Sequence, residues 1–364
     1  MRRLIGFYRE HYRVPLFEQM CVAVSGGADS MSLLVMANEW AKKHGVSIHC
    51  VTVDHKLREE SSEEAAFVGN FCESIGVDHR ILQWHRNGIE ITNGKLESLA
   101  RDARYKLISE FCEGNSIPVV LIGHTWNDQL ETFEMRKSRG SSASGLAGMS
   151  QVRSITNRVK LIRPILHFTK DHLEHFLKSR NILWKIDPMN CQEVFLRVFY
   201  RKKIARYSSD KIWDISNKIS QLGMKRNEIE MVAVYFLKKF CEFHEEGHVV
   251  IGKQQLLLEE TTVQTEILKR LIWNVGEKKY APRINEDICD KILCKKINTL
   301  GGCLLKIDKE KIFIFKENRK PGVQKGSSGG LPCVAQNHKI ICKTNGSSND
   351  FLGSKKINLF DVFL

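Results

Sequence analysis

The sequence predicts an α/β fold in which a parallel five-stranded sheet with helices on both faces is followed by a smaller, mainly helical domain. The first 190 residues alternate short apolar runs with amphipathic stretches, which is typical of a parallel sheet covered on both faces. Beyond residue 210 this alternation stops and longer helical patterns take over. The 364-residue chain is 42% hydrophobic and 27% charged, which indicates a globular protein of two or three domains and excludes a disordered or collagen-like chain.

Five apolar runs in the first part are predicted strands. They cover residues 20–24, 46–53, 79–84, 118–122 and 161–166, and the last is expected at a sheet edge because Pro164 interrupts it. Five amphipathic stretches have apolar residues at helical spacing and are predicted helices: residues 30–44, 59–75, 96–112, 127–139 and 170–180. Ligands of such sheets bind beyond the carboxyl ends of the strands, so the loops that follow the strands are candidate functional sites.

The second part has a different pattern. Residues 195–207 combine apolar and basic side chains and are predicted to form a helix, as are residues 228–243 and 264–275. Residues 304–307 and 312–316 form a predicted strand pair. We therefore expect a catalytic domain over residues 1–215, a mainly helical substrate-binding domain over residues 216–318, and a Gly/Ser/Lys-rich tail over residues 319–364.

Charge is distributed unevenly along the chain. The net charge is +14, but residues 1–150 carry −2 and residues 151–364 carry +16. This split favours a catalytic unit joined to a unit that binds a polyanion such as nucleic acid. The alternative is a basic surface that serves solubility alone.

The cysteines and the hydropathy indicate the compartment. None of the eleven cysteines forms a Cys-x-x-Cys pair, so a disulfide framework and a structural zinc or iron–sulfur site are not expected. Cys21, Cys50, Cys72 and Cys112 lie in apolar stretches and are predicted to be small buried side chains. We expect a reducing compartment, the cytoplasm. No apolar run approaches the about 20 residues of a membrane span, and the basic N-terminus lacks a signal peptide's apolar segment, so no membrane association is expected.

The most specific motif is SGGADS, between the first predicted strand and the first predicted helix. Adjacent glycines leave the backbone without Cβ atoms, so that its amides can close around phosphate oxygens, and the helix that follows directs its positive end there. Asp29 suits a Mg²⁺ ion that bridges it to a polyphosphate. The alternative is a tight strand-to-helix turn with a serine cap. The predicted nucleotide-binding residues are Ser25, Gly26, Gly27, Ala28, Asp29 and Ser30.

These residues resemble a known family. SGGADS matches the SGGxDS loop of the N-type ATP pyrophosphatases (PP-loop proteins), which cleave ATP between the α and β phosphates. Further segments, in the family's order over about residues 20–205, resemble the tRNA(Ile)-lysidine synthetases. The matching residues include Val53, Asp54, His55, Leu57, Arg58, Ser61, Glu64, Ala65, Ala100, Arg101, Arg104, Tyr105, Gly123, His124, Asp128, Gln129, Glu131, Thr132, Arg139, Gly140, Gly145, Leu146, Gly148, Met149, Arg163, Pro164, Trp184, Asp187, Pro188 and Asn190.

The resemblance implies an adenine-nucleotide alpha-hydrolase-like fold and a ligase reaction. Such an enzyme uses ATP with Mg²⁺ to adenylate the wobble cytidine of isoleucine tRNA with the anticodon CAU, releasing pyrophosphate. The ε-amine of free L-lysine then displaces AMP to form lysidine, which changes the codon read from AUG to AUA. Another PP-loop tRNA-modifying enzyme, such as a thiolase, is the alternative, although paired cysteines to carry sulfur are absent. A small-molecule amidotransferase and a non-catalytic RNA-binding protein fit the residues less well.

Further catalytic residues are predicted from spacing together with the resemblance. His124, Asp128 and Glu131 lie at i, i+4 and i+7 and are expected on one face of a helix at the sheet's carboxyl edge. The two carboxylates suit the amine of a lysine substrate, although a solvated acidic face has the same pattern. Arg104 is a candidate for the α-phosphate or the adenylate, or else a surface arginine. Asn127 replaces the aspartate that is usual in the family, which puts any direct role of that position in doubt.

A basic segment follows. It is predicted to bind tRNA through Arg197, Arg201, Lys202, Lys203 and Arg206, with aromatic residues between them. The alternative is a solvated basic helix. Val198 and Phe199 stand where the family tends to Asn-Arg, so one contact of that family is changed here. A homodimer is compatible with the sequence.

Overall fold

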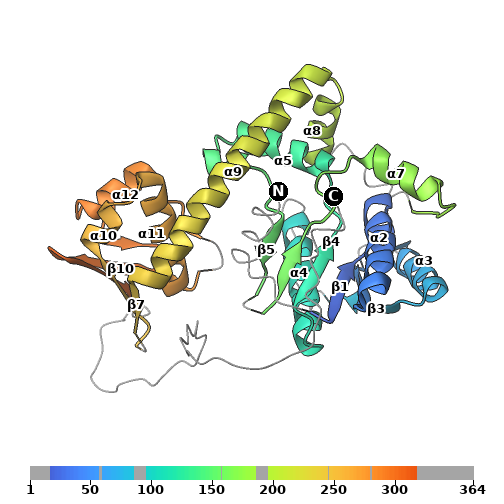
Figure 1. Cartoon of the computed structure of the whole chain (residues 1–364), viewed down its shortest axis with the longest axis horizontal. Coiled ribbons are helices and arrows are strands. Elements are labelled where there is room, and N and C mark those ends of the chain that lie inside the picture. Colours follow the sequence, from blue (N-terminus) through green and yellow to red (C-terminus); the bar gives the residue numbers. More distant parts are fainter. Residues whose placement is uncertain are drawn as a thin grey trace, which may run out of the picture. The chain divides into compact units, whose positions relative to one another are not determined.

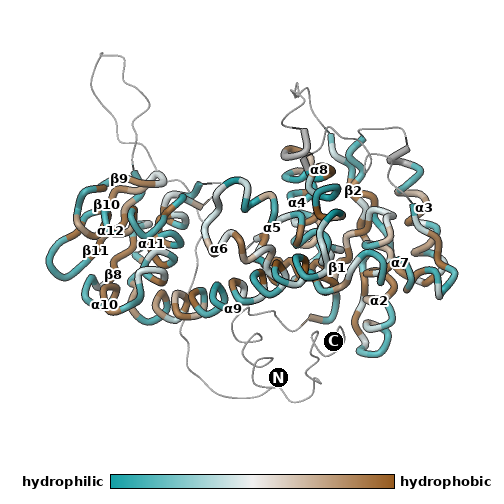
Figure 2. Tube along the Cα trace, turned by 90° about the horizontal axis from the view of Figure 1, so that it is seen from above, coloured by the Kyte–Doolittle hydropathy of each residue, from teal (hydrophilic) through white to brown (hydrophobic). Residues whose placement is uncertain are grey.

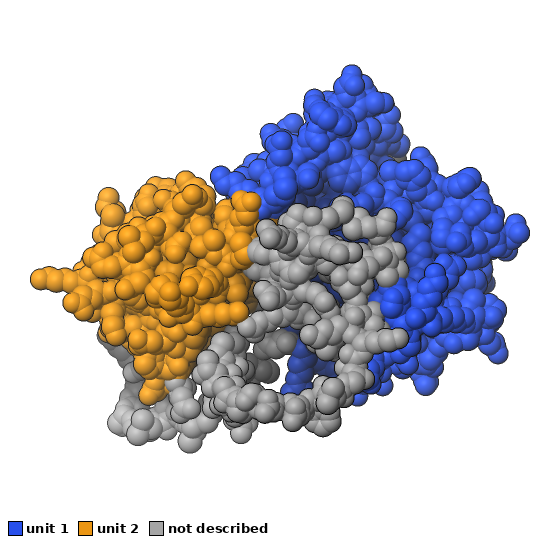
Figure 3. Space-filling view, viewed as in Figure 1, with its two compact units in different colours: residues 1–226, 356–364 blue, residues 227–355 orange. Residues whose placement is uncertain are grey.

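The computed structural model describes residues 17–56, 60–85, 96–156, 158–185, 196–244, 246–278 and 281–317. Within these ranges the chain divides after Arg226 into two compact units, which Figure 3 colours separately. None of the helices in the described ranges is long and apolar enough to cross a membrane. The expectations that lie outside the described residues concern Leu57, Arg58, Asp187, Pro188, Asn190 and the tail over 319–364.

The first unit is built on a six-stranded sheet with the strand order β3–β2–β1–β4–β6–β5 (Figure 1). Val22 of β1 pairs with Cys50 of β2 on one side and with Leu121 of β4 on the other. The predicted five parallel strands are confirmed. They are β1 (Gln19–Ala23), β2 (Ser47–Asp54), β3 (Asp78–Gln83), β4 (Val119–Ile122) and β6 (Lys160–Ile162).

One edge of this sheet differs from the prediction. A sixth strand, β5 (Val152–Ser154), pairs antiparallel with β6, so the strand before Pro164 is not an edge strand. β6 also ends at Ile162, before the proline. The sequence concealed β5 because it has only three residues, of which Val152 alone is buried.

Helices cover both faces of the sheet, as predicted. Met20 and Val22 of β1 pack with α2 (Ala28–His44), α3 (Glu60–Ile75) and α7 (Lys170–Lys178). Cys21 points to the opposite face, where it packs with Ile108 of α4 (Leu96–Gly114). The alternation follows from the period of two along a strand. The four cysteines predicted to be buried, Cys21, Cys50, Cys72 and Cys112, are fully buried in these two cores.

The first unit also contains α5 (Trp126–Ser138), α6 (Ala143–Leu146) and α8 (Leu196–Ile204). Helix α9 (Ser209–Phe240) begins in the first unit and continues into the second. Leu130 and Phe133 of α5 pack with Ile215 and Ile219 of α9. Hydrophilic and hydrophobic residues alternate along much of α9, as Figure 2 shows. The helix is longer than the predicted 228–243, and the last three of those residues form a strand instead.

The second unit combines helices with an antiparallel sheet of the order β7–β8–β11–β10–β9. Its strands are β7 (Cys241–Phe243), β8 (Val249–Gly252), β9 (Thr299–Leu300), β10 (Cys303–Ile307) and β11 (Lys311–Lys316). Its helices are α10 (Lys253–Leu257), α11 (Thr261–Gly276) and α12 (Glu286–Leu293), together with the end of α9. Phe236, Ile267 and Ile314 share its core. The mainly helical character is confirmed, and the predicted strand pair, β10 and β11, belongs to this larger sheet.

Candidate active site

The SGGADS segment forms a closed loop between β1 and α2. The backbone N–H of Ser25 donates to the Ser30 hydroxyl (3.1 Å), and that hydroxyl donates to the Gly27 carbonyl (3.0 Å). Gly26 has a φ of +87°, a conformation that favours glycine. Because the first N–H groups of a helix have no partner within the helix, the start of α2 has amides that could bind an anion.

Asp29 lies in the first turn of α2 and is largely buried, with 23% of its side chain exposed. Burial, together with the negative charges of Asp128 and Glu174, raises its pKa to about 6 against the opposing charges of Lys170 and Arg201. Its ion pair with Lys170 of α7 is long, 3.7 Å between Nζ and Oδ2. A desolvated carboxyl beside a second carboxyl is an environment that a divalent cation would relieve.

The carboxyl end of β4 lies directly against this loop. A Cβ atom added to Gly123 would come within 3.2 Å of the Asp29 carbonyl and of the Ser30 Cα, so a larger residue would push on the start of α2. This close approach brings the residues after β4 to the nucleotide loop.

His124 follows Gly123 and lies before α5, not on it, which corrects the prediction that it shares a helix face with the two carboxylates. The Arg163 guanidinium donates from Nε to its Nδ1 (3.1 Å). Burial and the adjacent Arg163 lower its pKa to about 3. The ring is therefore neutral at physiological pH, and because Nδ1 accepts, Nε2 carries the proton and can donate.

Asp128 has a structural role in addition to any functional one. It occupies the third position of α5, where its Oδ2 accepts from the backbone N–H (2.8 Å) and the hydroxyl (3.2 Å) of Thr125, as in a capping box. Its other oxygen lies 4.0 Å from Arg197 Nη1 of α8.

Glu131 lies one turn further along α5 and is only 3% exposed. Its Oε1 accepts from Arg201 Nε (2.9 Å), whereas its buried Oε2 has no hydrogen-bond partner among the described residues. Glu134, equally buried, pairs with Lys203 (2.7 Å). A buried carboxylate oxygen without a donor is costly, and an additional cationic group would relieve that cost.

Three of the predicted tRNA-binding residues contact acidic side chains, and exposure to solvent is not limited to the others, because Lys203 is also exposed. Arg197, Arg201 and Lys203 pair with acidic residues of α5. Lys202 and Arg206 are exposed to solvent. Sequence reasoning missed the acidic partner Glu134, and no local signal could have found it, because about 70 residues separate the paired positions.

Arg104 lies apart from these pairs. Its guanidinium contacts His55, after β2, with 3.3 Å between Nη2 and Nε2. Burial and this cation lower the pKa of His55 to about 4. The positive charge of Arg197 acts on both Arg104 and His124, so these three side chains share one electrostatic environment.

The loop from Gly140 to Met149 is held to α5 by side chains whose positioning role the sequence did not indicate. The side-chain amide of Gln129 makes two hydrogen bonds with the backbone of Met149, as a paired strand would. Its Nε2 donates to the Met149 carbonyl (3.0 Å), and its Oε1 accepts from the Met149 N–H (2.6 Å). Arg136 and Arg226 both donate to the Gly148 carbonyl, at 3.0 and 2.9 Å.

Sequence comparisons match the first part of the chain to a family model and most of the chain to curated relatives. The family model described as PP-loop domain matches residues 4–207. The tRNA(Ile)-lysidine synthase of Wolbachia pipientis wMel is 32% identical over 83% of this chain and 71% of its own length. That of Orientia tsutsugamushi is 30% identical over 82% of this chain and 70% of its own length. Among solved structures, the U34-tRNA thiolase NcsA from Methanococcus maripaludis, with its [4Fe-4S] cluster, is a distant neighbour with 15% identity, 63% of this chain and 79% of that chain covered, and a TM-score of 0.48.

The sheet order, the SGGADS loop and the matching model define a PP-loop protein that uses ATP. Within that class the similarity to curated relatives is more specific, because it extends beyond the PP-loop domain. The chain belongs to the tRNA(Ile)-lysidine synthase family, whose members are ligases that form a C–N bond.

Proposed function

We propose that this chain uses ATP to attach free L-lysine to the wobble cytidine of isoleucine tRNA with the anticodon CAU, in the cytoplasm. The products are lysidine, AMP and pyrophosphate, and the modified tRNA reads AUA instead of AUG. One observation carries the proposal beyond family membership: the Asp128 carboxylate of α5 lies within electrostatic reach of Asp29 in the nucleotide loop. A cationic substrate and ATP can therefore meet at one edge of the sheet.

The loop and the start of α2 would hold the phosphates of ATP. Mg²⁺ fits here on the chemistry of the donors, because Asp29 is desolvated, has a raised pKa, and its ion pair with Lys170 is long. Asp29 would hold the ion, which supplies charge neutralisation to the phosphates when it is bound. Lys170 would turn from Asp29 to the phosphate oxygens.

His124, Arg163 and Arg104 are suited to the α-phosphate of ATP, where the reaction would take place. Neutral His124 presents its Nε2–H as a donor, and Arg163 holds the ring in that tautomer. Arg104 adds a guanidinium close to the charge of Arg197. These groups would orient the α-phosphate toward the cytidine and stabilise its developing negative charge.

Asp128 and Glu131 would bind the lysine substrate. Oε2 of Glu131 and Oδ1 of Asp128 can accept from an ammonium group, and α8 already places guanidinium groups near both carboxylates. The ε-amine must lose a proton before it attacks, and a nearby carboxylate can take or relay that proton.

The same ion pairs connect tRNA binding to the lysine site. tRNA phosphates would compete with Glu131 for Arg201 and with Asp128 for Arg197, because a guanidinium binds a phosphate or a carboxylate in the same bidentate manner. When tRNA docks on α8, the α5 carboxylates would become available to lysine. ATP binding does not require this exchange.

Mass spectrometry of nucleosides tests the proposal. Isoleucine tRNA with the anticodon CAU, incubated with the protein, ATP and lysine, should yield lysidine, and omission of lysine should abolish it. ATP–pyrophosphate exchange that requires tRNA should accompany the reaction. A thiolated nucleoside in the presence of a sulfur donor, with no lysidine, would instead support the thiolase alternative.

A further inference from the structure

The second unit contains a cluster of metal-ligating side chains that the reaction does not use. It lies at the tip of the β7–β8 hairpin, where Phe243 pairs with Val249. One step beyond this pair, the backbone N–H of His244 donates to the His248 carbonyl (3.0 Å). The two histidines thus face each other across the end of the hairpin. Side chains that are directly opposite on antiparallel strands project to the same face, with Cβ atoms about 4.5–5.5 Å apart.

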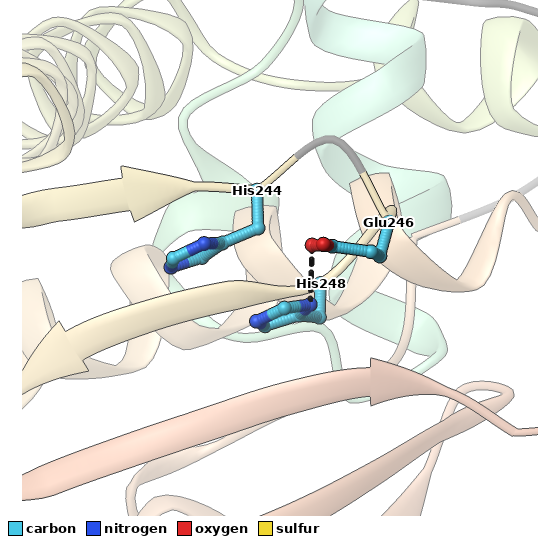
Figure 4. Close-up of side chains that lie close together, drawn as sticks. All are labelled: His244, Glu246 and His248. Carbon is cyan, nitrogen blue, oxygen red and sulfur yellow. Dashed lines mark ion pairs between the residues drawn. The ribbon is translucent and has the colours of Figure 1, made fainter.

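The three side chains converge, as Figure 4 shows. The imidazole rings of His244 and His248 are stacked, with 4.3 Å between centroids and 4° between planes. Glu246, from the turn, directs its carboxylate at His248, with 3.7 Å between Oε2 and Nδ1. One potential ligand atom from each residue lies within 4.8 Å of those from the other two.

The hairpin supports this arrangement from two sides. The ring of His248 also stacks on Phe315 of β11, with 5.1 Å between centroids, which fixes its plane. Glu242 lies 3.9 Å from Nε2 of His244, through its Oε2. A carboxylate beside a histidine ring is the usual outer partner that orients a metal-binding imidazole.

We infer that His244, Glu246 and His248 form a binding site for a divalent transition-metal ion, with Zn²⁺ as the best match. Two imidazoles and one carboxylate are a ligand set that Zn²⁺ accepts at about 2.0–2.2 Å, with a water molecule as the fourth ligand. Mg²⁺ prefers an all-oxygen environment, so the ion of the ATP site does not compete here.

Binding requires the His244 ring to rotate out of the stack, because an imidazole lone pair lies in the ring plane and two parallel rings cannot direct theirs at one ion. Tetrahedral ligands at these bond lengths lie roughly 3.4 Å apart, so separations of up to 4.8 Å must shorten by at most about 1.4 Å. His244 and Glu246 are exposed and can rotate freely, whereas His248, held against Phe315, supplies the fixed ligand. The ion would fasten the turn to β8. The cysteine pattern gave no sign of this site because none of its ligands is a thiolate.

Cobalt titration of the full chain, in a buffer with excess Mg²⁺, tests the inference. Co²⁺ should bind in a one-to-one ratio, with visible absorption of nitrogen and oxygen ligation and without the near-ultraviolet bands of a thiolate, and Zn²⁺ should displace it. H244A and H248A should each weaken binding by at least about 100-fold, and E246Q by about 10-fold, because loss of even an outer partner costs 10–100-fold.

The matched control is H175A, which removes an exposed histidine from α7 in the first unit and should leave the affinity unchanged. Circular dichroism of each variant, recorded without metal, should be the same as that of the parent chain. Thiolate bands, a lack of cobalt absorption, or unchanged affinity in H244A and H248A would each overturn the assignment.

Discussion

The nucleotide loop and the α5–α8 interface are both built from polar groups, but their polar groups find partners at different distances along the chain. In the loop, Ser25, Gly27 and Ser30 satisfy one another over three to five residues. At the interface, Arg201 and Lys203 reach carboxylates about 70 residues away. The first N–H groups of α2 have no partner within the helix and can bind a ligand. At the interface, by contrast, the charged groups form ion pairs with one another.

The difference predicts how each substrate binds. The loop can bind a phosphate as it stands, whereas the α5 carboxylates must exchange an arginine for the lysine substrate or hold both. Among the described residues, the ion pair that a phosphate would meet at this loop is the long Lys170–Asp29 pair. A lysine ammonium must take the place of an arginine at Asp128, or share Glu131 with one. We therefore expect ATP binding to be independent of tRNA, and lysine binding to depend on it.

The largest effect is expected at the loop. D29A should lower turnover at least about 100-fold, because it removes the carboxylate proposed to hold Mg²⁺ against the phosphates. The measurement is lysidine formation at saturating ATP, lysine and tRNA. D171A, which removes an exposed acidic residue in the first turn of α7, is the control and should retain activity. Product formation by D29A at the parental rate would remove Asp29 from the metal site.

The next effect distinguishes the two carboxylates that pair with arginines. E131Q should raise the KM for lysine about 10–100-fold and leave the KM for ATP nearly unchanged, because a charge-assisted hydrogen bond contributes about 1.5–3 kcal/mol. D128N should act in the same direction but should also weaken the capping box.

E134Q is the matched control for E131Q, since Glu134 is equally buried and also pairs with α8. It should leave the KM for lysine unchanged. If E131Q and E134Q have the same effect on lysine, the α5 carboxylates serve only to dock α8.

A smaller effect is expected on the exposed side of α8. K202A/R206A should weaken tRNA binding and flatten its log–log salt dependence by about two units, one for each phosphate contact. ATP affinity should not change. A salt series of tRNA affinities provides the measurement, and an unchanged slope would indicate that these residues are only a solvated basic face.

R201A sharpens the comparison, because it removes a residue that pairs inside the interface. It leaves Glu131 buried without its partner, so the free energy of unfolding should fall by about 1–2 kcal/mol. K202A/R206A should leave the stability within about 0.5 kcal/mol of the parent. Urea denaturation distinguishes the two variants.

The smallest effect concerns stability and pH. Burial raises the pKa of Asp29 to about 6, so the folded protein binds this proton more tightly than the unfolded chain does. The ionised carboxylate therefore costs stability above about pH 6, and the cost disappears as the pH falls toward 4. D29N should raise the free energy of unfolding at pH 7 by on the order of 1–2 kcal/mol, and the gain should vanish near pH 4. A constant gain at both pH values would exclude this titration as its cause.

The sequence was most informative where structure follows from local patterns. The five parallel strands and the SGGADS loop each depend on residues close in the chain, and the period of two along β1 already assigns Val22 and Cys21 to opposite faces. β5 was missed because three residues with one buried side chain form no pattern. His124 was placed on a helix because spacing alone does not show that Thr125 is the N-cap.

The charged site could be predicted only as a set of residues. Asp128, Glu131, Arg197 and Arg201 were identified as acidic and basic candidates, but their mutual pairing depends on how α5 packs on α8. The sequence assigned these groups separately to lysine and to tRNA. The structure adds that they hold one another, which is a tertiary property.

The position of Arg226 in the chain affects when one hydrogen bond of the first unit can form during translation. Its guanidinium donates to the Gly148 carbonyl from a position beyond the end of the matched PP-loop domain at residue 207. On the ribosome, every strand of the sheet emerges well before Arg226 does. The nascent sheet can therefore form while the segment around Gly148 still has only Arg136 to hold that carbonyl. The Arg226 hydrogen bond to Gly148 is thus added only after this part of α9, the helix that continues into the second unit, has been synthesised.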